Sequence, residues 1–218
     1  MQQFNSLTIE QYNNKRGLTL VELLIAVCIF ALIVIGFSSI DTFSHYHVMS
    51  SDRRAKLQND ASYVLEHMAK EISKAIGDVN QTTVDTSGIS GDAAVKVWID
   101  GNPYSIPPTS PNGRRDAYPT DCQIAYRFRG ATTGEIWYCP ECTNDSCTAC
   151  NPSWGDPSHP ENILSKRVSS FSPIYSSGND YVEIQLTACW NPAVTCGTLD
   201  NPQLTMKNRI YMPAVSTH

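Results

Sequence analysis

One apolar run constrains the fold of this chain more than any other feature. From Leu18 to Phe37 the sequence has 20 residues with a single charge, that of Glu22. At 1.5 Å per residue, a helix of this length spans about 30 Å, the hydrocarbon thickness of a bilayer. Lys15 and Arg16 stand directly before the run, and the positive-inside rule keeps them in the cytoplasm. The run therefore predicts a single membrane-spanning helix that sends the rest of the chain outward.

Glu22 lies near the start of this run, where a carboxylate costs free energy. Insertion scales give roughly 2.5–3.5 kcal/mol for a charge deep in the bilayer and less near the interface. In an apolar medium we expect Glu22 to have no good partner within its own chain. It is then either an interfacial charge that an ordinary anchor tolerates, or a charge that a neighbouring subunit pairs.

The residues around the start of the run resemble a known signature. Arg16 and Gly17, followed by Leu18–Ile25 with the sequence LTLVELLI, are similar to the type IV prepilin signal. In that family a membrane-embedded aspartyl peptidase cuts after the glycine and methylates the new N-terminus. The glutamate at the fifth mature position pairs with the N-terminal amine of a neighbour. The resemblance implies cleavage between Gly17 and Leu18, N-methylation of Leu18 and an assembly role for Glu22. The family usually has Phe where this chain has Leu18.

The resemblance also implies partners and a location. The partners are other pilins or pseudopilins, prepilin peptidase and an inner-membrane assembly platform. The chain is expected in the bacterial inner membrane as a single-pass protein with a periplasmic C-terminal domain. From there it would enter a pilus or a periplasmic filament.

Beyond Phe37 the sequence changes from uniformly apolar to periodic. One stripe recurs at helical spacing, formed by Leu57, Ala61, Val64, Leu65, Met68, Ile72 and Ile76. The pattern predicts one helix from Leu18 to about Ile76, stopped by Gly77, whose second half lies across a sheet. We divide the chain into a leader peptide (1–17), a transmembrane or filament-core helix (18–43), its amphipathic half (44–77) and a globular antiparallel β domain (78–218).

Short strand-like runs follow in the globular part. They are Ala94–Ile99, Gln123–Phe128, Glu135–Tyr138, Tyr181–Thr187 and Lys207–Met212. The polar segment 78–91 is predicted to be a connecting loop, and Gly130–Thr133 a hairpin loop with Arg129 facing Gly134. The predicted fold class is therefore α+β and pilin-like: a long helix packed on a small antiparallel sheet domain with Cys-rich loops.

The C-terminal third carries a second, weaker resemblance. Ile163–Phe171, followed by Tyr181–Leu186, is similar to the last hairpin of minor pilins and J-type pseudopilins. Such a pattern also fits many antiparallel hairpins. Together with the N-terminal signature it favours a minor subunit over a major pilin.

Cysteine usage agrees with an oxidising compartment, because the chain has eight cysteines. Cys28 lies in the apolar run and is expected to be a small packing residue. The other seven are Cys122, Cys139, Cys142, Cys147, Cys150, Cys189 and Cys196. Four of them form the pattern C-x2-C-x4-C-x2-C. We predict disulfides, with a zinc site at Cys139, Cys142, Cys147 and Cys150 as the less favoured alternative. A redox role for either C-x2-C pair is the least favoured, since no thioredoxin-like context surrounds it.

The predicted hairpin suggests which cysteines can meet. If Arg129 faces Gly134, Cys122 falls opposite Glu141 and Cys139 is a same-face diagonal neighbour at about 7–8 Å. Cys142 is also within reach of Cys122. Cys189 and Cys196 can close their own small loop. Seven is an odd number, so one thiol remains unpaired.

Composition and motifs exclude several function classes. The net charge of −5 argues against nucleic-acid binding by the globular part. No nucleophile elbow, zinc-protease helix, Walker A loop or glycine-rich dinucleotide turn is present in the sequence. We expect no enzyme and no cofactor other than the zinc alternative. The predicted function is that of a minor type IV pilin, processed by prepilin peptidase and active in pilus assembly or initiation. The alternatives are a J-type pseudopilin of type II secretion and an extracellular adhesive or metal-holding tip module.

Overall fold

The structure is a computed structural model of the chain. It describes residues 18–77, 83–103, 107–112, 116, 121–144, 147–151, 153–154, 158–159, 162–176 and 180–212. The chain divides into two compact units, one ending at His45 and one running from Tyr46 to His218. The inferred leader, including Gly17, lies outside the described residues.

The long helix α1 spans Leu20–Ile72. It therefore starts two residues later and ends four residues earlier than predicted. After Ile72 the chain makes a turn in which the Ala75 amide bonds the Ile72 carbonyl, and Ala75 then pairs with Ile99. Ile76 belongs to the predicted stripe and Ala75 to the predicted helix, but both are instead buried beyond the helix end, where Ala75 pairs with Ile99.

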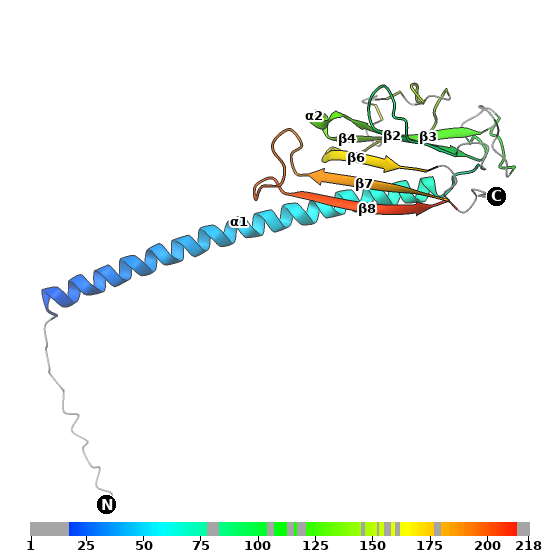
Figure 1. Ribbon diagram of the computed structural model, residues 1–218. Helices are drawn as coiled ribbons and strands as arrows, with labels where there is room; N and C mark the ends of the chain where they lie inside the picture. Colours follow the sequence, from blue (N-terminus) through cyan, green and yellow to red (C-terminus); the bar gives the residue numbers. More distant parts are fainter. Residues whose placement is uncertain are drawn as a thin grey trace, which may run out of the picture. The chain divides into compact units, whose positions relative to one another are not determined.

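Among the described residues after α1 there are eight strands, and they form two antiparallel sheets rather than one. The first sheet has the order β1-β2-β3-β4-β5 and the second the order β6-β7-β8. The strands are β1 (Val84–Asp85), β2 (Ala94–Ile99), β3 (Cys122–Arg129), β4 (Glu135–Cys139), β5 (Ile163–Ser165), β6 (Val168–Ile174), β7 (Tyr181–Cys189) and β8 (Gln203–Tyr211). Figure 1 shows β6, β7 and β8 running along the C-terminal part of α1.

The C-terminal part of α1 forms the main core together with one face of both sheets. From the helix come the predicted stripe residues Leu57, Ala61, Val64, Leu65, Met68 and Ile72, all buried. The alternation of β7 places Val182, Ile184 and Leu186 in the same core. Burial of this apolar stripe against the sheets explains why the second half of α1 is amphipathic.

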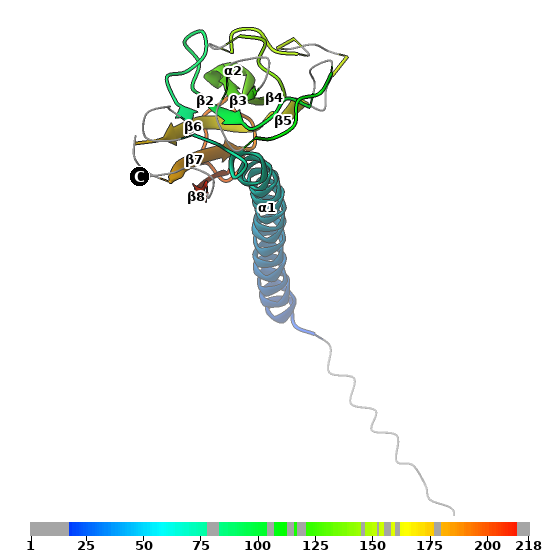
Figure 2. The same cartoon turned by 90° about the vertical axis from the view of Figure 1, so that its right-hand side faces the viewer.

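A second, smaller core covers the other face of the first sheet. It contains Ile89, Ala94, Ala125 and four cysteines, with Trp154 packed against it. Successive residues of a strand point to opposite faces, so Val95 and Val97 reach the main core while Ala94 faces this second layer. Figure 2 shows the cysteine-rich segment and α1 on opposite sides of the strands.

The hairpin between β3 and β4 differs from the prediction by one residue of register. Arg129 pairs with Glu135 rather than with Gly134. The connection is a short helical turn, α2 (Gly130–Thr133), which ends at Gly134 with a left-handed φ of 63°. Gly134 supplies this conformation without a steric penalty, so it belongs to the turn and not to the strand.

The segment predicted as one hairpin arm is shared between the two sheets. Ile163–Ser165 pairs with β4 at the edge of the first sheet, whereas Val168–Ile174 pairs with β7 in the second. The break falls at Lys166 and Arg167. Strands β6 and β7 pair antiparallel, as predicted for the hairpin. The prediction had one small sheet, whereas the strands form two sheets.

Candidate functional site

Glu22 has a partner within its own chain, contrary to the prediction. Its amide donates to Thr19 Oγ1 at 3.2 Å, and its carboxylate oxygen Oε2 accepts from the Thr19 amide and hydroxyl, both at 3.4 Å. This is a capping box, in which the residue before the helix and the third helical residue satisfy each other's amides. The carboxylate therefore caps the first turn of α1, where the helix dipole also favours a negative charge.

The apolar run behind Glu22 is uncovered within the described chain. Every residue from Leu18 to Met49 is exposed, and the large apolar side chains of this segment range from 41% exposed for Met49 to 81% for Leu20. The hydroxyls of Ser39 and Thr42 donate back to helix carbonyls four residues earlier. By length and composition α1 can cross a membrane. Such a surface requires lipid or other apolar helices around it.

Two nested disulfides close the cysteine-rich loop on the first sheet. Cys139 is bonded to Cys150, with Cα atoms 5.9 Å apart, and Cys142 to Cys147, with Cα atoms 4.8 Å apart. The loop is tied to β3 by a 2.7 Å hydrogen bond from the Cys142 amide to the Gln123 carbonyl. The sequence predicted bridges among these residues but did not give their connectivity.

Glu141 is a buried carboxylate inside this loop. Only 3% of it is exposed, and its two oxygens accept from the side-chain amides of Asn102 (3.3 Å) and Asn151 (3.0 Å). The backbone amide of Asn151 also donates to the backbone carbonyl of Glu141 at 2.9 Å. Hydrogen bonds to both side-chain oxygens compensate for their burial, so Glu141 joins the two sides of the loop.

Cys122 is not in a disulfide, which corrects the prediction that it could reach Cys139 or Cys142. Its thiol is free and buried. In the observed register Ala125 lies opposite Cys139, whereas the predicted register would place Ile124 there. Cys122 therefore shares the face of Ile124 and Tyr126, which belongs to the main core, while Cys139 faces the second core with Ala125. A one-residue shift in register moves a side chain to the other face of a sheet.

The environment of Cys122 makes its thiol unreactive. Burial raises its pKa to about 11, and the carboxylates of Glu141 and Asp121 act in the same direction. The thiolate is the nucleophile and metal ligand, so Cys122 stays a neutral packing group at ordinary pH.

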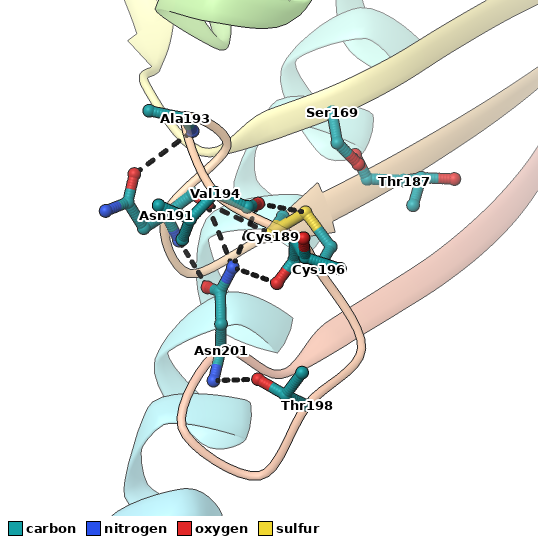
Figure 3. The surroundings of a disulfide bond; sticks show 10 residues. Ser169, Thr187, Cys189, Asn191, Ala193, Val194, Cys196, Thr198 and Asn201 are labelled. Atoms are coloured by element: carbon teal, nitrogen blue, oxygen red, sulfur yellow. Dashed lines mark hydrogen bonds between the residues drawn. A yellow bond between two sulfur atoms is a disulfide. The ribbon is translucent and has the colours of Figure 1, made fainter.

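The third disulfide joins Cys189 to Cys196 and closes a loop after β7, as the sequence suggested. Figure 3 shows that the side chain of Asn201 points into this loop. Its oxygen accepts from the Asn191 amide at 2.7 Å, and its nitrogen contacts the carbonyls of Asn191, Val194 and Thr195 within 3.3 Å. Asn201 thus fixes the loop backbone from within.

Sequence reasoning missed the residues that attach this loop to α1. The guanidinium of Arg167 lies 4.2 Å from the Trp190 ring centre, and that of Arg53 lies 5.7 Å from it. Arg167 also forms a 2.8 Å ion pair with Asp60 of α1. Arg53 donates a hydrogen bond to the Asp200 carbonyl. These contacts join residues that are far apart in sequence, so no local sequence pattern predicts them.

Comparison with known proteins gives one result at the N-terminus. A family model described as the prokaryotic N-terminal methylation motif matches residues 12–38. Neither the curated proteins nor the solved structures contain a significant match to the chain. The matched residues cover the basic pair, Gly17, Glu22 and the apolar run of α1. The chain therefore carries the prepilin-type signal of the type IV pilins and pseudopilins, whose subunits are processed by prepilin peptidase and assemble with one another.

Proposed function

We propose that this protein is a minor type IV pilin that takes part in the assembly or initiation of a pilus. The observation that carries the proposal is the exposed apolar run of α1, which contains the helix-capping Glu22 near its start and lies within the methylation motif. An uncovered surface of this size is stable in lipid or among other apolar helices. A filament subunit needs both environments, first in the membrane and then in the filament core.

The capping box suggests how Glu22 serves both states. In the unassembled subunit its carboxylate accepts from Thr19, which lowers the cost of a charge in the membrane. In the filament a neighbour's methylated Leu18 amine would supply a full positive charge in place of these weaker donors. A charge-assisted contact in an apolar medium is stronger than a hydrogen bond to a neutral donor. The carboxylate would then set the axial register between subunits.

A J-type pseudopilin of type II secretion is the alternative within the same family. It has the same N-terminal signal and assembles in a short periplasmic filament. Deleting the gene separates the two functions. Loss of surface pili with normal protein secretion supports the minor pilin, whereas loss of secretion with normal pili supports the pseudopilin.

The cross-linked cysteine loop supports a second candidate, an extracellular tip module. The loop lies on the face of the first sheet opposite α1 and is held by two disulfides and the buried Glu141. Rigid loops on a folded scaffold are frequent binding sites. If the deletion strain forms normal numbers of pili that no longer attach to surfaces, the tip role is favoured over a role in initiation.

Processing provides the direct test of the proposal. Intact mass spectrometry of the protein from sheared filaments should show an N-methylated Leu18 as the first residue. The variant Gly17→Ala should accumulate as an uncleaved precursor in the membrane fraction, while Lys15→Ala serves as a control outside the cleaved bond. Assembled protein that still begins at Met1 would contradict the proposal.

A further inference from the structure

We propose that the loop from Cys139 to Cys150 is a zinc site in its reduced form, so that zinc and the two disulfides exclude each other. The four cysteines follow the spacing C-x2-C-x4-C-x2-C, and all four are buried. This proposal concerns the second core of the globular unit and is independent of the role of Glu22.

The four sulfur atoms already form one cluster. The Sγ atoms of Cys139, Cys142 and Cys147 lie within 4.8 Å of one another, and Cys150 is bonded to Cys139. Cys139 Sγ and Cys142 Sγ are 4.0 Å apart. In a tetrahedral zinc site with bonds of about 2.3 Å, two thiolates are about 3.8 Å apart. The unbridged pair Cys139 and Cys142 is therefore near the separation that zinc requires, and the two bridged pairs would move apart to it once reduced.

The backbone of the loop is held by contacts that do not involve sulfur. Cys142 pairs with Cys150 as an isolated antiparallel bridge, and the Thr143 amide bonds the Ala149 carbonyl at 3.0 Å. The Asn144 side chain accepts from the Thr148 amide at 3.0 Å, and Trp154 Nε1 donates to the Cys147 carbonyl at 3.1 Å. Reduction would thus leave the four thiols gathered on one side of the sheet.

The surroundings favour a soft, dehydrated cation. Ile89, Ala94 and Ala125 line the sheet side of the cluster, and Trp154 packs against it. The carboxylate of Glu141 is engaged with the amides of Asn102 and Asn151. Four thiolates in an apolar shell select zinc over calcium or magnesium, which require oxygen ligands.

The exchange balances in electrons and protons. A phosphine supplies two electrons to each disulfide and takes the oxygen of one water, whose two protons complete the two thiols; a dithiol supplies both electrons and both protons itself and becomes a disulfide. Binding of one Zn²⁺ by the four thiols then releases four protons, because the ligand is the thiolate. Two molecules of a small disulfide oxidant re-form the two bridges by thiol–disulfide exchange; each takes up two electrons and leaves as two thiolates, and loss of the four ligands expels the ion. The loop would therefore hold metal under reducing conditions and release it in an oxidising compartment.

Cobalt provides the test, because it reports tetrahedral thiolate ligands by its visible spectrum. The full mature chain in detergent is reduced with a phosphine, freed of reductant without oxygen and titrated with Co²⁺ and then Zn²⁺. We expect one cobalt per chain with tetrahedral thiolate bands, displaced by one equivalent of zinc, and none in the oxidised protein. Cys147→Ser should lose the bands, while the matched variant Cys196→Ser, outside the loop, should keep them.

A second measurement covers the case in which Cys147→Ser fails to fold. In the reduced wild type, zinc should protect Cys139, Cys142, Cys147 and Cys150 from alkylation but leave Cys189 and Cys196 open to it. Reduced wild type that shows no one-to-one tetrahedral spectrum overturns the proposal. Equal loss of the bands in the two variants, or protection of Cys189 and Cys196 together with the loop, also overturns it.

Discussion

The capping box at Thr19 and Glu22 allows the charge of Glu22 to be separated from its local structural role. Glu22→Gln keeps a side-chain acceptor at the third helical position, which a capping box accepts, but removes the charge. Thr19→Ala keeps the charge and removes the hydroxyl that accepts from the Glu22 amide at 3.2 Å. Glu22→Ala removes both the charge and the side-chain acceptor of Glu22. The three variants thus separate the contribution of helix capping from that of the Glu22 charge.

The two contributions differ in size. Loss of a helix cap costs about 1 kcal/mol, or roughly a fivefold change in an equilibrium. A neighbour's Leu18 amine left unpaired in an apolar core costs roughly 3–5 kcal/mol, or more than about a hundredfold. Anchoring should survive in all three variants, because the exposed run from Leu23 to Ile40 is unchanged. In the two Glu22 variants, loss of the charge also lowers the insertion cost.

The assay compares mature protein in the membrane and sheared-filament fractions at equal expression. Glu22→Gln and Glu22→Ala should remain processed and membrane-bound yet disappear from filaments, while Thr19→Ala should still be incorporated at a reduced level. If Glu22→Gln is incorporated like the wild type and Thr19→Ala is not, Glu22 acts only as a helix cap. The intersubunit charge pair would then be refuted.

Two further predictions concern the globular unit. Cys122 should resist alkylation in the native oxidised protein and react after unfolding. Its pKa is raised from 9.0 to about 11 in the folded protein, so the thiol ionises first in the unfolded chain. Its contribution to the free energy of unfolding is therefore complete below pH 9 and is lost as the pH rises towards 11. Native labelling, or an alkaline denaturation profile unchanged in Cys122→Ala, would contradict this. Arg167→Ala should lower the free energy of unfolding by about 1–2 kcal/mol through loss of its contacts with Asp60 and Trp190. The adjacent Lys166→Ala, whose side chain is 67% exposed, should change it by less than about 0.5 kcal/mol in the same urea titration, and equal effects would contradict the assigned role of Arg167.

Local periodicity predicted those parts of the fold that bury one regular face. Strand β2 has the predicted bounds Ala94–Ile99, and the alternation of Tyr181–Thr187 gave the core-facing residues of β7. The helical stripe from Leu57 to Ile72 is buried as expected. In each case the side-chain period of a single element determines which residues are covered, so no tertiary information is needed.

Features that depend on a turn or on distant residues were not predicted. Gly134 belongs to the turn between β3 and β4, and this one residue changed the register and moved Cys139 away from Cys122. The short strand β1, Val84–Asp85, has no pattern of its own and is defined by pairing with β2, where Asp85 meets Lys96 in a 2.6 Å ion pair. Disulfide connectivity likewise follows from the register and not from spacing.

The observed register also explains why the second core uses cysteines. On the face opposite α1, strands β2 and β3 present the small residues Ala94 and Ala125, which bury little apolar surface of their own. Small side chains leave room for a loop to approach the sheet closely, but they cannot hold it by area alone. A disulfide that closes a short loop contributes about 2–3 kcal/mol, comparable to the burial of a large aliphatic side chain. Cross-links at Cys139–Cys150 and Cys142–Cys147 therefore help to hold the loop against Ala94 and Ala125. The main core on α1 contains no disulfide among the described residues, so its packing does not depend on the redox state of the loop.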